Sequence, residues 1–148
     1  MRDHDLMRAA LEQAQRAAAD NEVPVGAVVV QNGNILAVAH NRPLSLIDPT
    51  AHAEVLAIRA AAAHIGACRL TDAAIYVTIE PCVMCIGAII HARIAQIYYG
   101  ARDDKAGALG SVYDIGRDGR LNHRVEVHGG LLALECGEVL SQFFASRR

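Results

Sequence analysis

The sequence has no long apolar run and no excess of basic charge. Its longest apolar stretches fall far short of the roughly 20 residues that a membrane-spanning helix needs. The formal net charge is −2, so a general positive field that would hold nucleic acid of any sequence is excluded. The first residues, Met1 to Asp5, are too charged for a secretory signal. We therefore expect a cytoplasmic protein in which any contact with nucleic acid comes from a local patch.

Cysteine is scarce as well, with four residues in a chain of 148. This excludes the disulfide framework of a small secreted protein. Two of the four form the Cys-x-x-Cys of Cys82 and Cys85, a spacing that in a cytosolic protein indicates metal or redox chemistry. Cys68 and Cys136 stand alone, and we expect both to be small buried apolar residues.

The apolar periodicity predicts one domain over residues 1–148 with alternating helices and strands. The expected helices cover residues 4–20, 51–63, 82–91 and 131–144, and the expected strands cover 25–30, 35–39, 74–79, 94–99 and 124–127. An Asn-Gly turn at 32–33 joins the first two strands in a hairpin. This order predicts a three-layer α/β/α sandwich with a central mixed five-stranded sheet.

Local signals place the starts of two helices. Thr50 is expected as the N-cap of the helix over 51–63, and Pro81 in the first turn of the helix over 82–91. The loop between Gly100 and Gly116 carries four glycines and is expected to hold one short helix. In the pair Phe143-Phe144 we expect one ring to be buried.

Two short motifs indicate the chemistry. His52-Ala53-Glu54 is weak alone, because His-x-Glu often occurs by chance, and Cys82-Val83-Met84-Cys85 alone is ambiguous between a metal site, a redox pair and buried thiols. Together, two thiolates and one imidazole supply three ligands that zinc prefers and leave a fourth position for water, which is typical of catalytic zinc. Glu54 is then placed to take a proton from that water and pass it to a leaving nitrogen.

These motifs resemble those of the zinc nucleobase deaminases, in which His-x-Glu precedes Pro-Cys-x-x-Cys. Most of the chain is similar to the bacterial tRNA-specific adenosine deaminases in particular. The similar segments are Val23–Val30, Asp48–Glu54, Tyr76–Cys85, Gly100–Ala108, Asn122–Glu126 and Phe143-Phe144.

The resemblance implies hydrolysis of adenosine to inosine at the wobble position of a tRNA anticodon, by a zinc-activated water that attacks C6 of a flipped base. It implies one Zn²⁺ per chain and a homodimer whose two subunits line each site for the tRNA anticodon stem-loop. By position, His52, Cys82 and Cys85 hold the metal and Glu54 moves protons. The residues implied in substrate binding are Asn41 on the nucleoside, Val25 and Ala27 in the pocket wall, and Asp103, Phe144 and Arg147 on the RNA.

Two alternative functions stay open, and the sequence departs from the family pattern at two places. A small-molecule deaminase of guanine or cytosine would use the same scaffold, although Gly100–Ala108 disfavours it; a non-catalytic zinc-binding partner subunit is disfavoured by the intact Glu54. Gln142 stands where some relatives carry an acid, and no long basic tail follows Arg147, which concerns RNA affinity rather than chemistry. Phosphate contacts are expected from a patch near the zinc mouth, drawn from Arg42, Arg69, Arg102, Lys105, Arg147 and Arg148.

Overall fold

The structure, a computed structural model, describes residues 1–147. Within that range one mixed sheet has the strand order β2-β1-β3-β4-β5. Its strands are β1 (Gly26–Gln31), β2 (Asn34–His40), β3 (Ala73–Ile79), β4 (Gln96–Ala101) and β5 (Glu126–His128). The pairs β1–β2 and β1–β3 are antiparallel, and the pairs β3–β4 and β4–β5 are parallel. The predicted hairpin and mixed sheet are confirmed.

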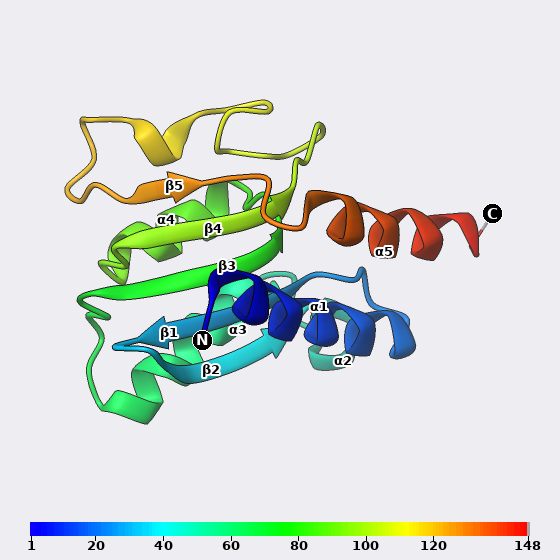
Figure 1. Cartoon of the computed structure of the whole chain (residues 1–148), viewed down its shortest axis with the longest axis horizontal. Coiled ribbons are helices and arrows are strands. Elements are labelled where there is room, and N and C mark those ends of the chain that lie inside the picture. Colours follow the sequence, from blue (N-terminus) through cyan, green and yellow to red (C-terminus); the bar gives the residue numbers. More distant parts are fainter. Residues whose placement is uncertain (148) are drawn as a thin grey trace.

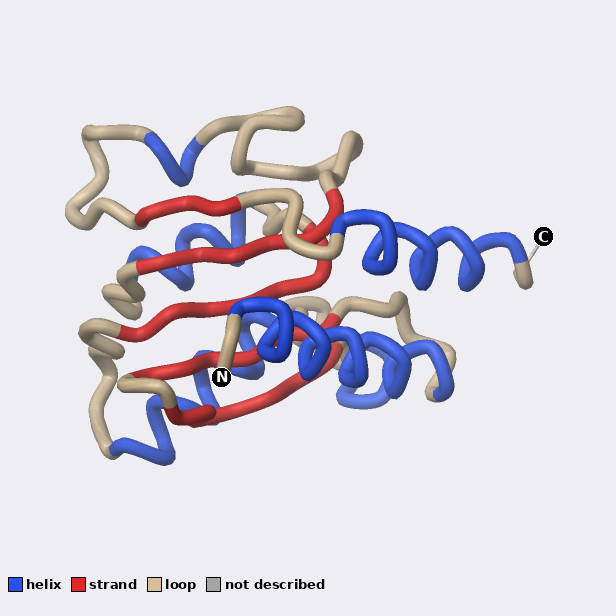
Figure 2. The backbone as a smooth tube through the Cα atoms, viewed as in Figure 1, coloured by secondary structure: helices blue, strands red, loops and turns tan. Residues whose placement is uncertain are grey.

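Helices cover both faces of this sheet. α1 (Asp3–Ala19) and α5 (Ala133–Ala145) lie in front of it in Figure 1, and α3 (Ala53–Ile65) and α4 (Val83–His91) lie behind it. Two short helices, α2 (Pro43–Leu46) and η1 (Ile115–Arg117), lie in the connections, which Figure 2 draws in tan between the regular elements. The architecture is the predicted α/β/α sandwich, and between residues 1 and 147 no helix is long and apolar enough to cross a membrane.

The central strand β1 is buried because both of its faces are covered. Ala27 and Val29 belong to the core on the side of α3 and α4, whereas Val28 and Val30 pack with Leu6 and its neighbours on α1. Alternate side chains of a strand point to opposite faces, so a strand buried on both sides has a nearly continuous apolar sequence.

The two helices that carry the motifs start later than expected. α3 begins at Ala53 with His52 as its N-cap, not at Ala51 after Thr50, because the Thr50 hydroxyl donates a hydrogen bond to Asp48 Oδ1 (2.7 Å) instead of capping the helix. α4 begins at Val83 with Cys82 as its N-cap, so Pro81 precedes the helix. Both motifs therefore begin at an N-cap.

Of the remaining expectations from the sequence, some are confirmed and others are wrong. Cys136 is buried, but Cys68 is exposed, because α3 ends at the left-handed Gly66 and Cys68 lies in the loop beyond it. Phe143 is buried and Phe144 is 46% exposed, as the pattern predicted for one ring of the pair. The short helix η1 is confirmed, and α2 was not predicted.

Candidate metal centre and cleft

Three metal-ligating side chains converge where α3 and α4 begin. His52 is the N-cap of α3, Cys82 is the N-cap of α4, and Cys85 lies in the first turn of α4. His52 Nδ1 is 3.7 Å from Cys82 Sγ and 3.4 Å from Cys85 Sγ, and the three ligand atoms all lie within 4.8 Å of one another. Because both helices lie behind the same face of the sheet (Figure 1), residues far apart in sequence meet at one corner.

The charges at this corner suit a cation. The Cys85 thiol donates a hydrogen bond to Cys82, which with His52 lowers the pKa of Cys82 to about 4. The same bond to Cys82 and burial raise the pKa of Cys85, and the hydrogen bond with Cys82 raises the pKa of His52. Two sulfurs and an imidazole that share protons at this distance are a donor set for zinc, since a metal ion can replace those protons.

Glu54 is the second residue of α3, two positions after His52, and lies in the first turn of this helix. Its side chain is only 4% exposed, and burial raises the pKa of its carboxyl. A buried carboxyl holds a proton more readily than an exposed one. This is the property that a proton shuttle near neutral pH needs.

The corner opens into a cleft of about 430 Å³. That volume lies in the range of small-molecule sites, which runs from about 300 to 1,000 Å³. The lining brings together six of the residues predicted from the sequence: Val25, Asn41, His52, Glu54, Cys82 and Asp103. Cys85 is fully buried behind it.

Asn41 and Asp103 both help to shape the cleft. Asn41 Oδ1 accepts a hydrogen bond from the Ala53 N–H (2.8 Å), so its oxygen holds the start of α3 and its amide N–H groups stay available to a ligand. Asp103 Oδ1 accepts from the N–H groups of Lys105 (3.0 Å) and Ala106 (3.2 Å) and closes a turn. Asn41 is thus both a structural residue and a candidate contact.

Several predicted contacts lie elsewhere. Ala27 has no exposed surface and belongs to the core rather than to the cleft lining, because β1 is covered on both faces. Arg69 follows the C-terminal end of α3, whereas the metal corner is at its N-terminal end, so Arg69 is not near the zinc mouth. Phe144 is exposed on α5 and does not line the cleft. Arg148 lies outside the described residues.

Arg147 is connected to the cleft by a hydrogen bond to Asn21. Its guanidinium is 3.5 Å from the centre of the Phe143 ring and donates a hydrogen bond to Asn21 Oδ1 (2.8 Å). Asn21 in turn lines the cleft. Arg147 therefore ties the end of α5 to the cleft rim.

The lining residues that were not predicted include two acids, Glu22 and Glu80. Glu22 accepts hydrogen bonds from the N–H groups of Leu44 (3.2 Å) and Ser45 (2.7 Å) and from the Ser45 hydroxyl (2.6 Å). Burial pushes the pKa of Glu22 upward, but these bonds outweigh it and the pKa is lowered. The sequence signal for Glu80 is an acid that directly follows the apolar strand β3.

Comparison with known proteins agrees with this geometry. The family model of the MafB19-like deaminases matches residues 1–148. The tRNA-specific adenosine deaminase of Haemophilus influenzae is 48% identical over 147 residues, which are 99% of this chain and 85% of the relative. A structure from work on A-to-I editing by tRNA:A34 deaminases at the wobble position of transfer RNA has a TM-score of 0.89 and 43% identity over 92% of this chain and 99% of its own. Guanine deaminase from Nitrosomonas europaea is similar with a TM-score of 0.83 and 26% identity, over 97% of this chain and 85% of its own.

Proposed function

The chain belongs to the tRNA-specific adenosine deaminases of this deaminase family, and on that premise we propose that it hydrolyses adenosine to inosine at the wobble position of a tRNA anticodon. The observation that carries the proposal is the convergence of His52, Cys82 and Cys85 beside the buried Glu54 at one cleft. In this reaction water adds to C6 of adenine and the amino nitrogen leaves as ammonia.

His52, Cys82 and Cys85 would hold one zinc ion per chain. The donor set fits, since two sulfurs and an imidazole nitrogen lie within 4.8 Å of one another and among the described residues no further histidine or cysteine joins them. Three protein ligands are typical of catalytic zinc, and four are typical of structural zinc. When bound, zinc supplies a Lewis acid that makes water acidic enough to react near neutral pH.

Glu54 moves the protons. Its carboxylate accepts a proton from the attacking water and donates it to the exocyclic nitrogen, so that ammonia can leave. Burial favours the protonated carboxyl and shields it from solvent.

The cleft receives one splayed nucleotide. Val25 contributes an apolar wall, Asn41 offers its amide N–H groups to the nucleoside, and Asp103 lies on the rim. Bases of an anticodon loop are already poorly stacked, so turning one into a pocket costs less than it does in a duplex. Exposed Arg42, Arg102 and Lys105 lie beside these residues and supply phosphate contacts.

We also propose that residues 1–148 act as one zinc-dependent deaminase domain in a cytoplasmic homodimer. Helix α4 leaves Val83 (45% exposed) and Met84 (37% exposed) at the surface next to the metal ligands, and α3 leaves Ala60 and Ala63 exposed. Apolar surface on neighbouring helices is typical of a protein interface. A second subunit there would lie close to the cleft.

The test is product identity. Purified zinc-loaded protein is incubated with an anticodon stem-loop that carries adenosine at the wobble position, and with a matched stem-loop that carries guanosine there. Nucleoside mass spectrometry should find inosine and stoichiometric ammonia from the first RNA alone. Ammonia from free guanine or cytosine without inosine from the stem-loop would move the assignment to the small-molecule deaminases. No product from any substrate, with zinc bound, would favour a non-catalytic partner subunit.

A further inference from the structure

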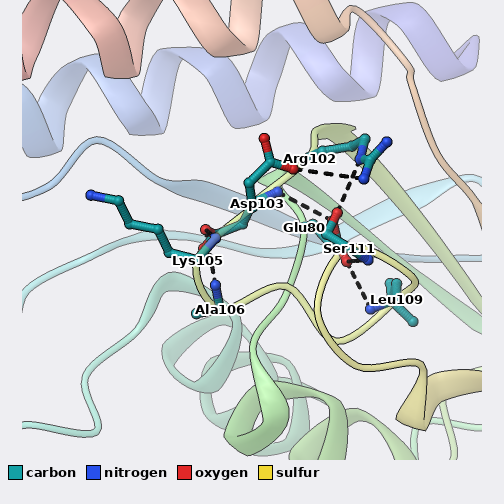
Figure 3. A network of polar contacts seen from close by, with 8 residues as sticks. Glu80, Arg102, Asp103, Lys105, Ala106, Leu109 and Ser111 are labelled. Atoms are coloured by element: carbon teal, nitrogen blue, oxygen red, sulfur yellow. Dashed lines mark hydrogen bonds and ion pairs between the residues drawn. The ribbon is translucent and has the colours of Figure 1, made fainter.

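The buried carboxylate of Glu80 lies inside the turn at residues 103–111. It is 2% exposed and follows the last residue of β3. It accepts hydrogen bonds from the N–H groups of Asp103 (3.2 Å), Leu109 (2.8 Å) and Ser111 (3.2 Å), and from the Ser111 hydroxyl. Figure 3 shows these donors arranged around the carboxylate. Four hydrogen bonds to one buried charged group hold this segment to the end of the strand.

The turn approaches Glu80 so closely that a side chain is excluded at Gly107. A Cβ atom there would lie 2.5 Å from Glu80 Oε2 and 2.6 Å from the carbonyl oxygen of Asp103. Real Cβ atoms essentially never make such contacts. Glycine is thus required by close approach, which is evidence, independent of the hydrogen bonds, that the turn is built around this carboxylate.

The turn presents groups to the cleft and to its rim. Asp103 and Ala106 line the cleft. Arg102 Nε donates a hydrogen bond to Ser111 Oγ (3.1 Å), whose proton is donated to Glu80. The Arg102 side chain is 68% exposed and lies 3.6 Å from Asp104. A chain of two hydrogen bonds therefore connects a buried carboxylate to an exposed cation beside the cleft.

We propose that Glu80 is a positioning residue for RNA, which orients the 103–111 turn and, through Ser111, the guanidinium of Arg102 toward a phosphate of the bound loop. The inference rests on the proposed function and adds a residue that acts on the substrate through the turn and through Ser111 and Arg102. We expect the loss of Glu80 to weaken RNA binding rather than the chemical step. Its hydrogen bonds come from Asp103, Leu109 and Ser111, and not from Glu54 or a metal ligand.

Glu80→Gln is the first variant, because it keeps the shape and replaces two acceptor oxygens by one acceptor and one donor. KM for the stem-loop should rise about tenfold, as for the loss of hydrogen bonds to a charged group, while kcat and zinc content stay near wild type. Hydrogen exchange at the amides of Leu109 and Ser111 should accelerate. Glu12→Gln, an exposed acid on α1, is the matched control and should change nothing.

Further variants keep the proposal testable if Glu80→Gln does not fold. Gly107→Ala should raise KM in the same way, and Gly137→Ala, where a Cβ would make an ordinary 3.8 Å contact, is its control. Ser111→Ala and Arg102→Ala should each weaken binding, and the double variant should be no weaker than Arg102→Ala alone if Ser111 acts through that arginine.

The outcomes distinguish a failure of the positioning role of Glu80 from a failure of the proposed function. Faster exchange in the turn with unchanged KM, or a fall in kcat at constant KM, would overturn the positioning role, as would additive effects of Ser111→Ala and Arg102→Ala. If the wild-type protein forms no inosine, the proposed function fails. The exchange comparison then still decides whether Glu80 holds the turn.

Discussion

The metal corner and the rim of the same cleft are built in different ways. At the corner, three ligands come from the first residues of two neighbouring helices, and Cys82 and Cys85 are only three residues apart. At the rim, separate loops are held by buried carboxylates that reach across long stretches of chain, from Glu22 to Ser45 and from Glu80 to Ser111. In the proposed function, the corner supplies the groups for the reaction and the rim selects the molecule that reaches them.

The largest expected effect is at the corner. Glu54→Ala should lower kcat by roughly 10²- to 10⁴-fold, the usual contribution of a positioned acid–base group. Zinc content and the folded state should be unchanged, because the three metal ligands remain. Turnover and metal analysis of the same preparation check both parts. A mutant that has lost its zinc would make Glu54 a ligand, and near-normal turnover would contradict the proposed mechanism.

Removal of a ligand should affect the metal as well as the rate. Cys85→Ala leaves one sulfur and one imidazole at the site, so zinc should be lost and activity with it. Elemental analysis after gel filtration measures the zinc, and thermal unfolding measures stability with and without added zinc. Cys68→Ala, at an exposed cysteine outside the group, is the control and should keep full zinc occupancy. Full occupancy of the Cys85 variant would show that the ligand set is wrong.

The subunit arrangement is the next comparison, because the proposed interface on α4 lies next to the metal ligands and close to the cleft. We expect sedimentation at micromolar concentration to give about twice the 15.8 kDa mass of one chain. Met84→Glu should weaken association, because it puts a charge on the exposed apolar surface of α4. A wild-type protein that sediments as a monomer would reject the dimer.

A smaller effect is expected at the end of α5. Arg147→Ala removes the bond to Asn21 and the stacking on Phe143, so the rim loses a support and one positive charge. KM for the stem-loop should rise a few-fold, kcat should change less, and the dependence of binding on salt should become shallower. Titrations at two salt concentrations measure this. A change confined to kcat would instead place Arg147 in the chemistry.

The different construction of the two regions explains which of their features could be predicted from the sequence and which could not. The convergence of His52, Cys82 and Cys85 was predictable because residue type, spacing and helix position are local properties of these three residues. The sandwich was predictable because the apolar periodicities of strands and helices differ. Glu22 and Glu80 were missed, because their donors come from loops 22 to 31 residues away. Thr50 was misassigned as a cap because its hydroxyl bonds to Asp48, a competition between local hydrogen bonds that residue type does not decide.

The separation of chemistry from recognition is tested most directly by kcat/KM for the anticodon stem-loop against kcat/KM for free adenosine, measured on the same zinc-loaded protein. Free adenosine can reach Glu54 and the metal but makes none of the phosphate contacts at the rim. We predict that the stem-loop is the better substrate by at least about 10²-fold, the factor that corresponds to two charge-assisted contacts. Equal values, or efficient turnover of free guanine or cytosine, would contradict a rim built for RNA.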